Sequence, residues 1–227
     1  MLPIQGTYNR RAAGNEPWLY RSAAIDNVGD DEVTALRRAG IELVIDLRDE
    51  CERATRTGAI PVTHIPIYDL PDGPPKAGSL RTVYELMLFE RGAGLASAVS
   101  AIARADSSVL VHCTAGKDRT GLVVALALLA AGVAESAVIA DYAASGAEVG
   151  AHRRDHVASM IDRLGLNGRE RAEALELHLD SPADALASAI AGINRRFGSV
   201  NEYLLTHGVS VLELARLRDK TAADVRA

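Results

Sequence analysis

The sequence is short of cysteine and of aromatic residues. Its two cysteines, Cys51 and Cys113, are too few for the disulfide framework of a small secreted domain, so we expect a reducing compartment. Aromatic side chains account for 4% of the 227 residues, which by itself favours no class of function.

Basic charge and long apolar runs are also scarce. The net charge of −5 and the isoelectric point of about 5.7 remove the bulk electrostatic case for a nucleic-acid partner. The most apolar stretch, residues 121–133, is too short to cross a bilayer and indicates a buried helix. The first residues lack the basic and apolar regions of a standard signal peptide. We therefore expect a cytoplasmic protein without a transmembrane segment; export without a signal peptide stays open.

The remaining composition is typical of a globular protein. Hydrophobic residues make up 48% and charged residues 24% of the chain, whose length suits one domain over residues 1–227. Residues 41–48, a short segment from Val62 and residues 107–113 are predicted strands. Predicted helices cover residues 29–40, capped by Asp30 or Asp31, residues 80–105, broken near Gly92 and Gly94, and residues 119–131.

The chain after Gly132 is predicted to be helical to its end. The candidate helices are residues 134–145, 148–164, 169–179, 182–197, 200–206 and 211–220. Strands that alternate with helices predict an α/β fold, with a central, mostly parallel sheet flanked by helices and a helical C-terminal third.

The stretch VHCTAGKDRTG, residues 111–121, carries most of the functional information. It lies between a predicted strand and a predicted helix, where open α/β sheets bind ligands. Loop N–H groups and the helix N-terminus can converge on one anion, and they favour the thiolate form of a cysteine held there. Cys113 and Arg119 therefore predict a nucleophile beside a guanidinium whose planar fork holds two phosphate oxygens.

The same stretch gives each loop residue an expected role. Gly116 lets the backbone curl close to the ligand, the Thr120 hydroxyl eases departure of the sulfur, and His112 orients the loop. Cys113 attacks phosphorus, and water then hydrolyses the phosphocysteine and releases phosphate, with no metal or other cofactor required. The expected phosphate-binding residues are Thr114, Ala115, Gly116, Lys117, Asp118, Arg119 and Thr120.

HCTAGKDRTG resembles the signature loop of cysteine-dependent tyrosine and dual-specificity phosphatases. More narrowly, the chain is similar to the bacterial tyrosine phosphatase family of the mycobacterial protein tyrosine phosphatase B type. The similarity runs along nearly the whole chain, through LYRSAAI, AGIELVIDLR, IADYAAS, FGSVNEYLLTHGVS and LARLRDK. It implies a tyrosine phosphatase fold and a phosphomonoesterase of broad specificity, which acts on phosphotyrosine, phosphoserine or phosphothreonine, and phosphoinositides.

The chain departs from this family near its start and matches it in a helical insert. Where the family has Asn-Phe-Arg-Asp-x-Gly-Gly, the sequence reads NRRAAGN, with Arg10 at the Phe place and Ala12 at the Asp place. We expect local packing and any ion pair of Arg11 to differ accordingly. Residues 146–180 correspond to the family's lid, which would gate substrates and shield the thiolate; a rigid helical cover of the sheet is the alternative.

The leaving group needs a proton, and three aspartates can supply it. Asp69 follows a predicted strand at the place where the family has an aspartate, so it is the first candidate. Asp118 lies in the signature loop and is the second, and Asp72 is the third. Asp46 and Arg48 are expected to form a structural ion pair under the loop, which makes Arg48 a supporting residue.

Lys117 adds a second cation to the loop. A lysine here resembles those of phosphoinositide phosphatases, where it holds an extra phosphate, and a solvated lysine is the alternative. We expect a phosphorylated protein or a phosphoinositide as substrate; the physiological substrate and the oligomeric state stay open.

Two further residue pairs carry weaker hypotheses. A reversible disulfide between Cys51 and Cys113 would protect the nucleophile if the two residues lie within disulfide reach. His152 and His156 have metal-ligand spacing on a predicted helix, but no Glu-x-x-His motif accompanies them, so we interpret them as surface or lid residues.

Other function classes also place a cysteine on an anion-binding loop. A catalytically inactive relative would bind phosphate or phosphoproteins, although binding alone does not need both Cys113 and Arg119. A thiol enzyme of the rhodanese or arsenate reductase type is the other alternative, but the Arg-Thr-Gly sequence and the C-terminal helices favour a phosphatase. Cysteine and arginine six residues apart are a weak signal alone, since a buried structural cysteine beside a helix-capping arginine has the same spacing.

Overall fold

A five-stranded sheet forms the centre of the computed structural model, which describes residues 4, 6–26, 28–53, 60–71 and 73–224. The strand order is β1-β2-β5-β3-β4; β1 pairs with β2 in antiparallel fashion, and the other neighbours pair in parallel. This confirms the expected mostly parallel sheet. The strands are β1 (Arg11–Ala13), β2 (Glu16–Ser22), β3 (Ile41–Asp46), β4 (Val62–His64) and β5 (Ser108–His112).

Helices connect the strands and make up the C-terminal part of the chain. Most predicted helices are confirmed, with ends shifted by a few residues. They are α1 (Asp30–Arg38), the 3₁₀ turn η1 (Glu50–Glu52), α2 (Leu80–Glu85), the π-helix η2 (Leu86–Glu90), α3 (Gly92–Arg104), α4 (Asp118–Ala131), α5 (Glu135–Ala143), α6 (Ser145–Arg163), α7 (Gly168–Leu179), α8 (Ala183–Phe197), α9 (Val200–Thr206) and α10 (Val211–Asp224).

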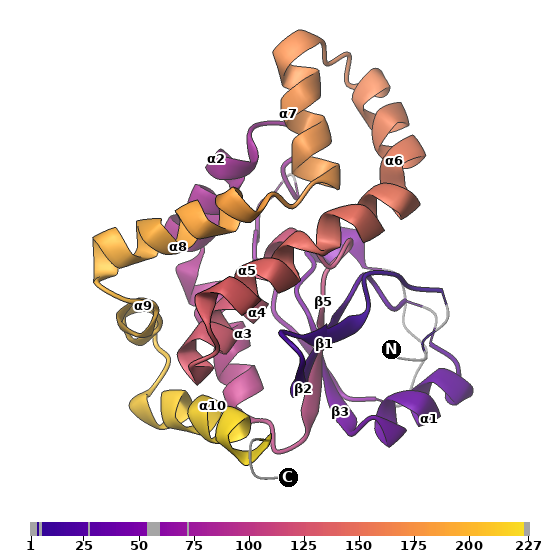
Figure 1. The fold of residues 1–227 in the computed structure, drawn as a ribbon. Helices are drawn as coiled ribbons and strands as arrows, with labels where there is room; N and C mark the ends of the chain where they lie inside the picture. The colour runs from indigo at the N-terminus through magenta and orange to yellow at the C-terminus, as the bar shows by residue number, and fades with distance from the viewer. Residues whose placement is uncertain (1–3, 5, 27, 54–59, 72, 225–227) are drawn as a thin grey trace.

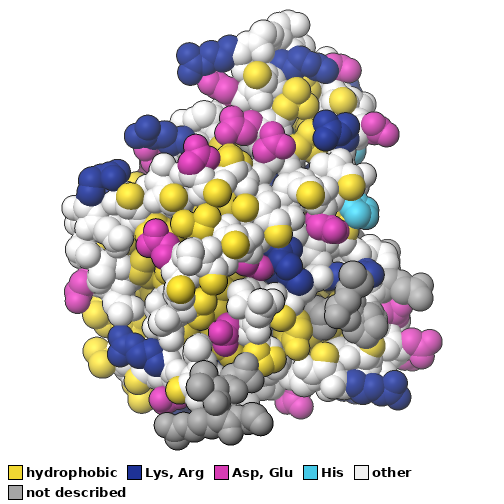
Figure 2. Space-filling model, viewed as in Figure 1, with side chains coloured by type: hydrophobic (Ala, Val, Ile, Leu, Met, Phe, Trp, Pro, Cys, Tyr) yellow, Lys and Arg dark blue, Asp and Glu magenta, His cyan; other side chains and the backbone are white. Residues whose placement is uncertain are grey.

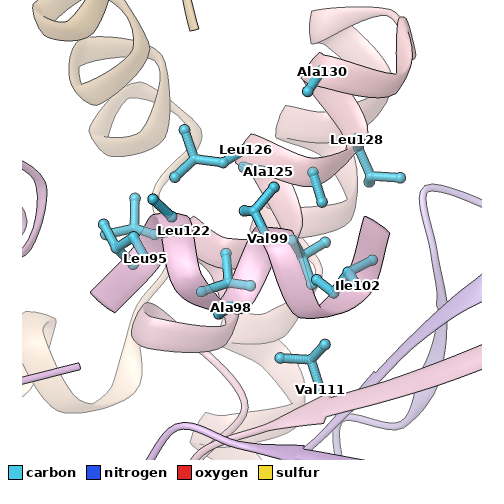
Figure 3. Packing of buried hydrophobic residues seen from close by; sticks show 14 of the residues in the cluster. Leu95, Ala98, Val99, Ile102, Val111, Leu122, Ala125, Leu126, Leu128 and Ala130 are labelled. Carbon is cyan, nitrogen blue, oxygen red and sulfur yellow. The ribbon is translucent and has the colours of Figure 1, made fainter. Parts of the chain in front are cut away.

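The helices cover the sheet unequally (Figure 1). Helix α1 lies on one side, where Leu36 joins a small apolar cluster with Val44 and Leu110 of the sheet. The larger core lies on the other side, where α3 and α4 pack against each other and against β5. Figure 3 shows labelled side chains of α3, among them Val99, and of α4, among them Leu126, gathered above Val111 of β5. Helix α4 is apolar nearly all round because α3, α5, α9, α10 and the sheet surround it.

Helices α6 and α7 form a hairpin that projects from the rest of the molecule, at the top of Figure 1. The hairpin has an apolar cluster of its own, formed by Val157, Ile161, Ala174 and Leu179. It coincides with the insert predicted at residues 146–180, and it approaches the body of the protein through α5 and α2.

Three details differ from the sequence-based expectations. Strands β1 and β2 were not predicted, because β2 is buried on both faces and even contains the fully buried Arg21, so it lacks an alternating pattern. The N-cap of α1 is Gly29, whose N–H donates to the Glu32 carboxylate at 3.1 Å, rather than Asp30 or Asp31. Helix α6 begins three residues earlier than predicted, at Ser145.

In the described part of the chain, no single helix is long and apolar enough to span a membrane. One pair, Leu80–Glu90 with Gly92–Arg104, meets that test by length and composition only, and it bends by 73° at the break between the two helices.

The core predicts the cost of shortening a side chain in α4. Leu126 is 2% exposed, so Leu126→Ala leaves a cavity and should lower the free energy of unfolding by about 2–5 kcal/mol. Leu212→Ala is the matched control, because Leu212 is 66% exposed and its loss should change stability by less than about 0.5 kcal/mol. Urea denaturation followed by circular dichroism measures both. Equal effects of the two substitutions would contradict the proposed packing of α4.

Candidate active site

The loop between β5 and α4 forms the floor of the candidate site. Cys113 follows the last residue of β5 directly, and α4 begins at Asp118. The neighbouring strands hold the entry to the loop: the N–H of Leu47 donates to the His112 carbonyl at 2.9 Å, and the N–H of Ala24 donates to the Thr114 carbonyl at 3.2 Å. The nucleophile expected from the sequence therefore lies at the carboxyl end of the central strand, with its side chain buried.

Two side chains from the N-terminal segment hold the loop from outside. The Asn9 amide donates to the carbonyls of Ala115 and Gly116 at 3.2 and 2.9 Å, and Arg21 donates to the Gly116 carbonyl at 2.7 Å. A trans peptide points its carbonyl and the following N–H in opposite directions. These bonds therefore turn loop N–H groups away from Asn9 and Arg21. No described residue accepts a hydrogen bond from the N–H groups of residues 114–117, so they are available to an anion.

Gly116 is the residue on which this loop shape depends. Its φ of +66° lies in the left-handed region, and a Cβ built on it would lie 2.2 Å from the Ser22 carbonyl oxygen. Any larger residue would force the loop away from β2. The expected role of Gly116 in a close backbone approach thus has a structural reason.

A cavity of about 190 Å³ lies above the loop. Residues of the loop line its floor, η1 and the segment before α2 contribute to its walls, and the α6–α7 hairpin contributes the remainder. The lining residues are Glu52, Tyr68, Pro74, Pro75, Lys76, Cys113, Thr114, Ala115, Asp118, Arg119, Arg153, Leu177 and His178.

Arg119 is oriented by a carboxylate that the sequence analysis did not single out. Glu52 accepts hydrogen bonds from both terminal nitrogens of Arg119, and from the hydroxyl of Thr114. Burial opposes ionisation of Glu52, but the bonds from Arg119 and Thr114 outweigh it and lower the pKa of this carboxyl. The Arg119 guanidinium also lies over the ring of Tyr68, 4.9 Å from its centroid. These contacts fix the guanidinium in the same cavity as Cys113.

Asp118 lines the cavity, and one of its two carboxylate oxygens is already engaged. Oδ1 accepts hydrogen bonds from the Tyr84 hydroxyl at 3.0 Å and from the Lys117 ammonium at 2.7 Å. The Tyr84 hydroxyl also lies 2.6 Å from that of Tyr142. Oδ2 has no hydrogen bond to any residue in the described ranges, so it is the oxygen that can carry a proton toward a ligand.

Lys117 does not line the cavity. Its side chain is fully buried, and its ammonium bonds to Asp118 and to the carbonyl of Asp180 at the end of α7. The solvated lysine considered as an alternative is therefore wrong. The expected contact with a second phosphate has no counterpart in the cavity lining, and Lys117 instead connects the loop to the base of the hairpin.

The other two acid candidates lie elsewhere. Asp69 is exposed and does not line the cavity; its backbone has a φ of +46°, and its N–H donates to the Asp49 carboxylate at 2.8 Å. Asp72 lies outside the described residues. Asp49 itself is buried, and burial raises the pKa of its carboxyl, but it does not line the cavity either.

The ion pair expected between Asp46 and Arg48 is present. The Arg48 guanidinium bonds to both carboxylate oxygens of Asp46 at 3.0 Å and also reaches Asp26. His112 Nε2 lies 3.9 Å from the Asp46 carboxylate, and its Nδ1 lies 3.3 Å from the Cys113 carbonyl oxygen. Arg48 and His112 thus stand beneath the loop and outside the cavity.

A second buried ionic cluster connects the loop to α5 and α6. Asp141 pairs with Arg21 at 2.6 Å and with Arg11 at 2.7 Å, and Arg11 also donates to the Ser145 hydroxyl at 3.0 Å. Arg11 therefore has an ion pair in this chain, with Asp141, and its expected difference from the family stays a prediction. Because Arg21 bonds to Gly116 as well, the cluster joins the signature loop to the start of the hairpin.

The Thr120 hydroxyl and the two cysteine thiols form no bond with one another in the structure. The Thr120 hydroxyl is buried and has no hydrogen-bond partner among the described residues, so no bond to Cys113 supports its expected role. Cys51 and Cys113 are both free thiols, and Cys51 is exposed on η1. The disulfide between them stays a hypothesis.

A family model assigns the chain as a whole. The model described as "Tyrosine phosphatase family" matches residues 5–223. The chain belongs to the tyrosine phosphatase family. The match extends from Asn9 through the signature loop to α10, and so includes every residue of the site described above. As a member of this family, the protein is a phosphatase enzyme.

Individual relatives agree with the family. The chain is 28% identical to the triple specificity protein phosphatase PtpB of Mycobacterium tuberculosis, over 88% of this chain and 89% of that protein. It is 32% identical to a tyrosine-protein phosphatase of Nostoc commune, over 51% of this chain and 40% of the relative. Among solved structures, TpbA of P. aeruginosa is 22% identical and covers 71% of this chain and 86% of its own, with a TM-score of 0.41.

Glu52, Asn9 and Asp141 are functional candidates that the residue-by-residue reasoning missed. Asn9 and Asp141 lie in NRRAAGN and IADYAAS, which resemble family segments, so the resemblance marked the segments without revealing their contacts. Glu52 had no signal of its own. It lies 67 residues before Arg119, and only the fold brings the two together.

The Asp141 cluster predicts a pH-dependent contribution to stability. Burial opposes ionisation of Asp141, but Arg21 and Arg11 outweigh it and lower the pKa of the carboxyl. Asp141→Asn leaves the fully buried Arg21 without its carboxylate, so the free energy of unfolding at pH 7 should fall by about 3–5 kcal/mol. A carboxyl with a lowered pKa stabilises the fold above its unfolded value of 3.8, and this contribution is lost as the pH falls through the folded value.

Urea denaturation of wild type and Asp141→Asn at a series of pH values measures this. The difference between them should be constant near neutrality and should shrink below pH 3.8. Asp155→Asn is the control, since Asp155 is exposed on α6 and should show no such difference. A gap between wild type and Asp141→Asn that does not depend on pH would contradict the ionic role.

Proposed function

We propose that the protein hydrolyses phosphomonoesters, with phosphotyrosine in proteins foremost, through a phosphocysteine on Cys113. The observation that carries the proposal is the arrangement of one loop: Cys113, Arg119 and Asp118 line one cavity, and the loop N–H groups are available to an anion. The proposed phosphate-binding residues are 114–120, with Arg119 supplying the bidentate contact that Glu52 now occupies.

The first step forms the phosphoenzyme. The Cys113 thiolate attacks phosphorus, an S–P bond forms, and the P–O bond to the leaving group breaks. We assign the proton donor to Asp118, because its unbonded Oδ2 belongs to a cavity-lining residue, whereas Asp69 does not line the cavity. Donation from Oδ2 gives the leaving oxygen its proton as the bond breaks.

The second step regenerates the enzyme. The Asp118 carboxylate accepts a proton from a water molecule that attacks phosphorus, the S–P bond breaks, and inorganic phosphate leaves with Cys113 again a thiolate. Loop N–H groups and Arg119 hold the same phosphoryl oxygens in both transition states. Every group that acts in this scheme belongs to one eleven-residue stretch, residues 111–121.

The proposed substrate range is broad. The name of the mycobacterial relative, a triple specificity protein phosphatase, supports more than one class of substrate. We propose phosphoserine and phosphothreonine beside phosphotyrosine. A phosphoinositide substrate remains part of the proposal, although the buried Lys117 does not supply the extra contact that was expected of it.

Substitution of Cys113 tests the reaction class. Cys113→Ser should abolish turnover of a phosphotyrosine peptide in the presence of EDTA, while the variant still binds that peptide in a calorimetric titration. Arg119→Lys should keep the charge but lose the fork, and so weaken binding and turnover together. Hydrolysis that survives Cys113→Ser would refute the phosphocysteine. A wild type that binds the peptide without turnover would instead identify a phosphate-binding module.

Comparison of Asp118→Asn with Asp69→Asn tests the proton donor. Loss of a general acid should lower kcat by about 10²–10⁴-fold for phenyl phosphate, and by less for 4-nitrophenyl phosphate, whose leaving group needs little protonation. We expect this leaving-group dependence for Asp118→Asn and not for Asp69→Asn. The reverse pattern would move the role to Asp69.

A further inference from the structure

Arg153 on α6 is a cation of the cavity that forms no ion pair with a carboxylate among the described residues. It is half-buried and lines the same cavity as Cys113 and Arg119. Its guanidinium has no hydrogen bond or ion pair within the part of the chain that the structure describes. A guanidinium that is partly withdrawn from water and has no protein acceptor has lost hydrogen bonds to water without replacement. An anionic ligand would supply the missing acceptor and so bind favourably.

The other buried cations near the loop are already engaged. Glu52 binds the fork of Arg119, and Lys117 is held by Asp118 and by the carbonyl of Asp180. Lys76 also lines the cavity, but its side chain is exposed on the segment before α2. A second anionic group in the cavity would therefore meet Arg153 before it meets Lys117.

Three contacts of neighbouring residues hold the part of the hairpin that carries Arg153. The hairpin carries its own apolar cluster, to which Val157 of the next helical turn belongs. His152 stacks on Tyr8 with 4.6 Å between the ring centroids, and the His178 ring bonds to the Lys76 carbonyl at 3.0 Å. Burial raises the pKa of Tyr8 to about 12, a rise that the charge of Arg153 opposes and that of Cys113 reinforces. Arg153 and Cys113 thus act on the same tyrosine.

Of the arginines in the hairpin, Arg153 is the one that lines the cavity. On the face shown in Figure 2, acidic and basic side chains are interspersed over the hairpin, and the exposed pairs Arg169–Glu173 and Arg171–Asp162 neutralise each other. Arg154, the next residue in the chain, is exposed and does not line the cavity. General attraction of anions to the hairpin therefore does not explain the placement of Arg153.

The walls of the cavity favour an aromatic phosphate over a phosphorylated sugar alcohol. Tyr68, Pro74, Pro75 and Leu177 present largely apolar surface between the loop and the hairpin. A phenyl ring packs well on such walls, whereas the hydroxyls of an inositol ring would lose water without gaining partners.

We propose that Arg153 binds an acidic residue flanking the phosphotyrosine of a peptide substrate, and so sets the sequence preference of the enzyme. This inference rests on the proposed phosphotyrosine phosphatase activity. While the phosphate lies on the loop with Arg119, a flanking carboxylate pairs with the free fork of Arg153. Arg153 is then a specificity-determining residue supplied by the hairpin.

The test compares two phosphotyrosine peptides that differ only in their flanking residues, Asp/Glu in one and Ala in the other. Wild type should show a kcat/KM about 10-fold or more higher for the acidic peptide, mainly through a lower KM. Arg153→Met should reduce this ratio to near one, and Arg153→Lys should restore it in part. Arg154→Met is the matched control and should keep the wild-type ratio.

The outcomes separate this inference from the proposed function. Hydrolysis of the Ala-flanked peptide that depends on Cys113 supports the function whatever the ratio is. A ratio that Arg153→Met leaves unchanged, with activity on both peptides falling together, would show a merely structural role and overturn the inference. The inference also fails if the ratio collapses equally in Arg154→Met. A soluble inositol bisphosphate is assayed as a third substrate, and a loss of activity in Arg153→Met that is confined to it would overturn the peptide preference.

Discussion

The hydrogen bonds from Asn9 and Arg21 to the signature loop are the contacts on which the rest of the site depends. A loop that binds an anion with its N–H groups must turn its carbonyls outward, and buried carbonyls need donors. Asn9 and Arg21 supply those donors at Ala115 and Gly116. Without them, the loop carbonyls would have to accept hydrogen bonds from the loop's own N–H groups. Those N–H groups would then no longer be available to an anion. The close approach of Gly116 to Ser22 is the steric side of the same constraint.

Arg21 is itself a buried charge, and its burial explains the cluster around it. A guanidinium with no exposed surface requires a carboxylate, which Asp141 provides, and Asp141 in turn binds Arg11. The Arg11 guanidinium also donates a hydrogen bond to the hydroxyl of Ser145, where α6 begins. The other end of the hairpin is tied to the loop through Lys117 and the carbonyl of Asp180. Both ends of the hairpin are therefore bonded to groups that shape the phosphate loop, so a displacement of the hairpin would have to break partly buried polar contacts.

The sequence was sufficient to predict the parts of the fold that rest on local patterns. The β-branched run of β3, the apolar helix α4 and the helix break near Gly92 follow from composition and spacing alone. Strand β2 could not be predicted in this way, because a strand buried on both faces that contains Arg21 has neither alternation nor a continuous apolar run. Likewise, Cys113 and Arg119 are recognisable because their spacing is local, whereas Glu52 reaches Arg119 only through the pairing of β3 with β5.

The assignment of Lys117 shows why charge alone does not identify a ligand-binding residue. A lysine in an anion-binding loop suggests a second phosphate contact, and nothing in the sequence distinguishes a side chain that points into the cavity from one that points beneath it. The structure shows two acceptors for the ammonium, the Asp118 carboxylate and the Asp180 carbonyl. The same bonds leave Asp118 Oδ1 fully occupied and Oδ2 available. In this loop, the cation that was expected to bind the substrate instead donates a hydrogen bond to one oxygen of the neighbouring aspartate, Asp118.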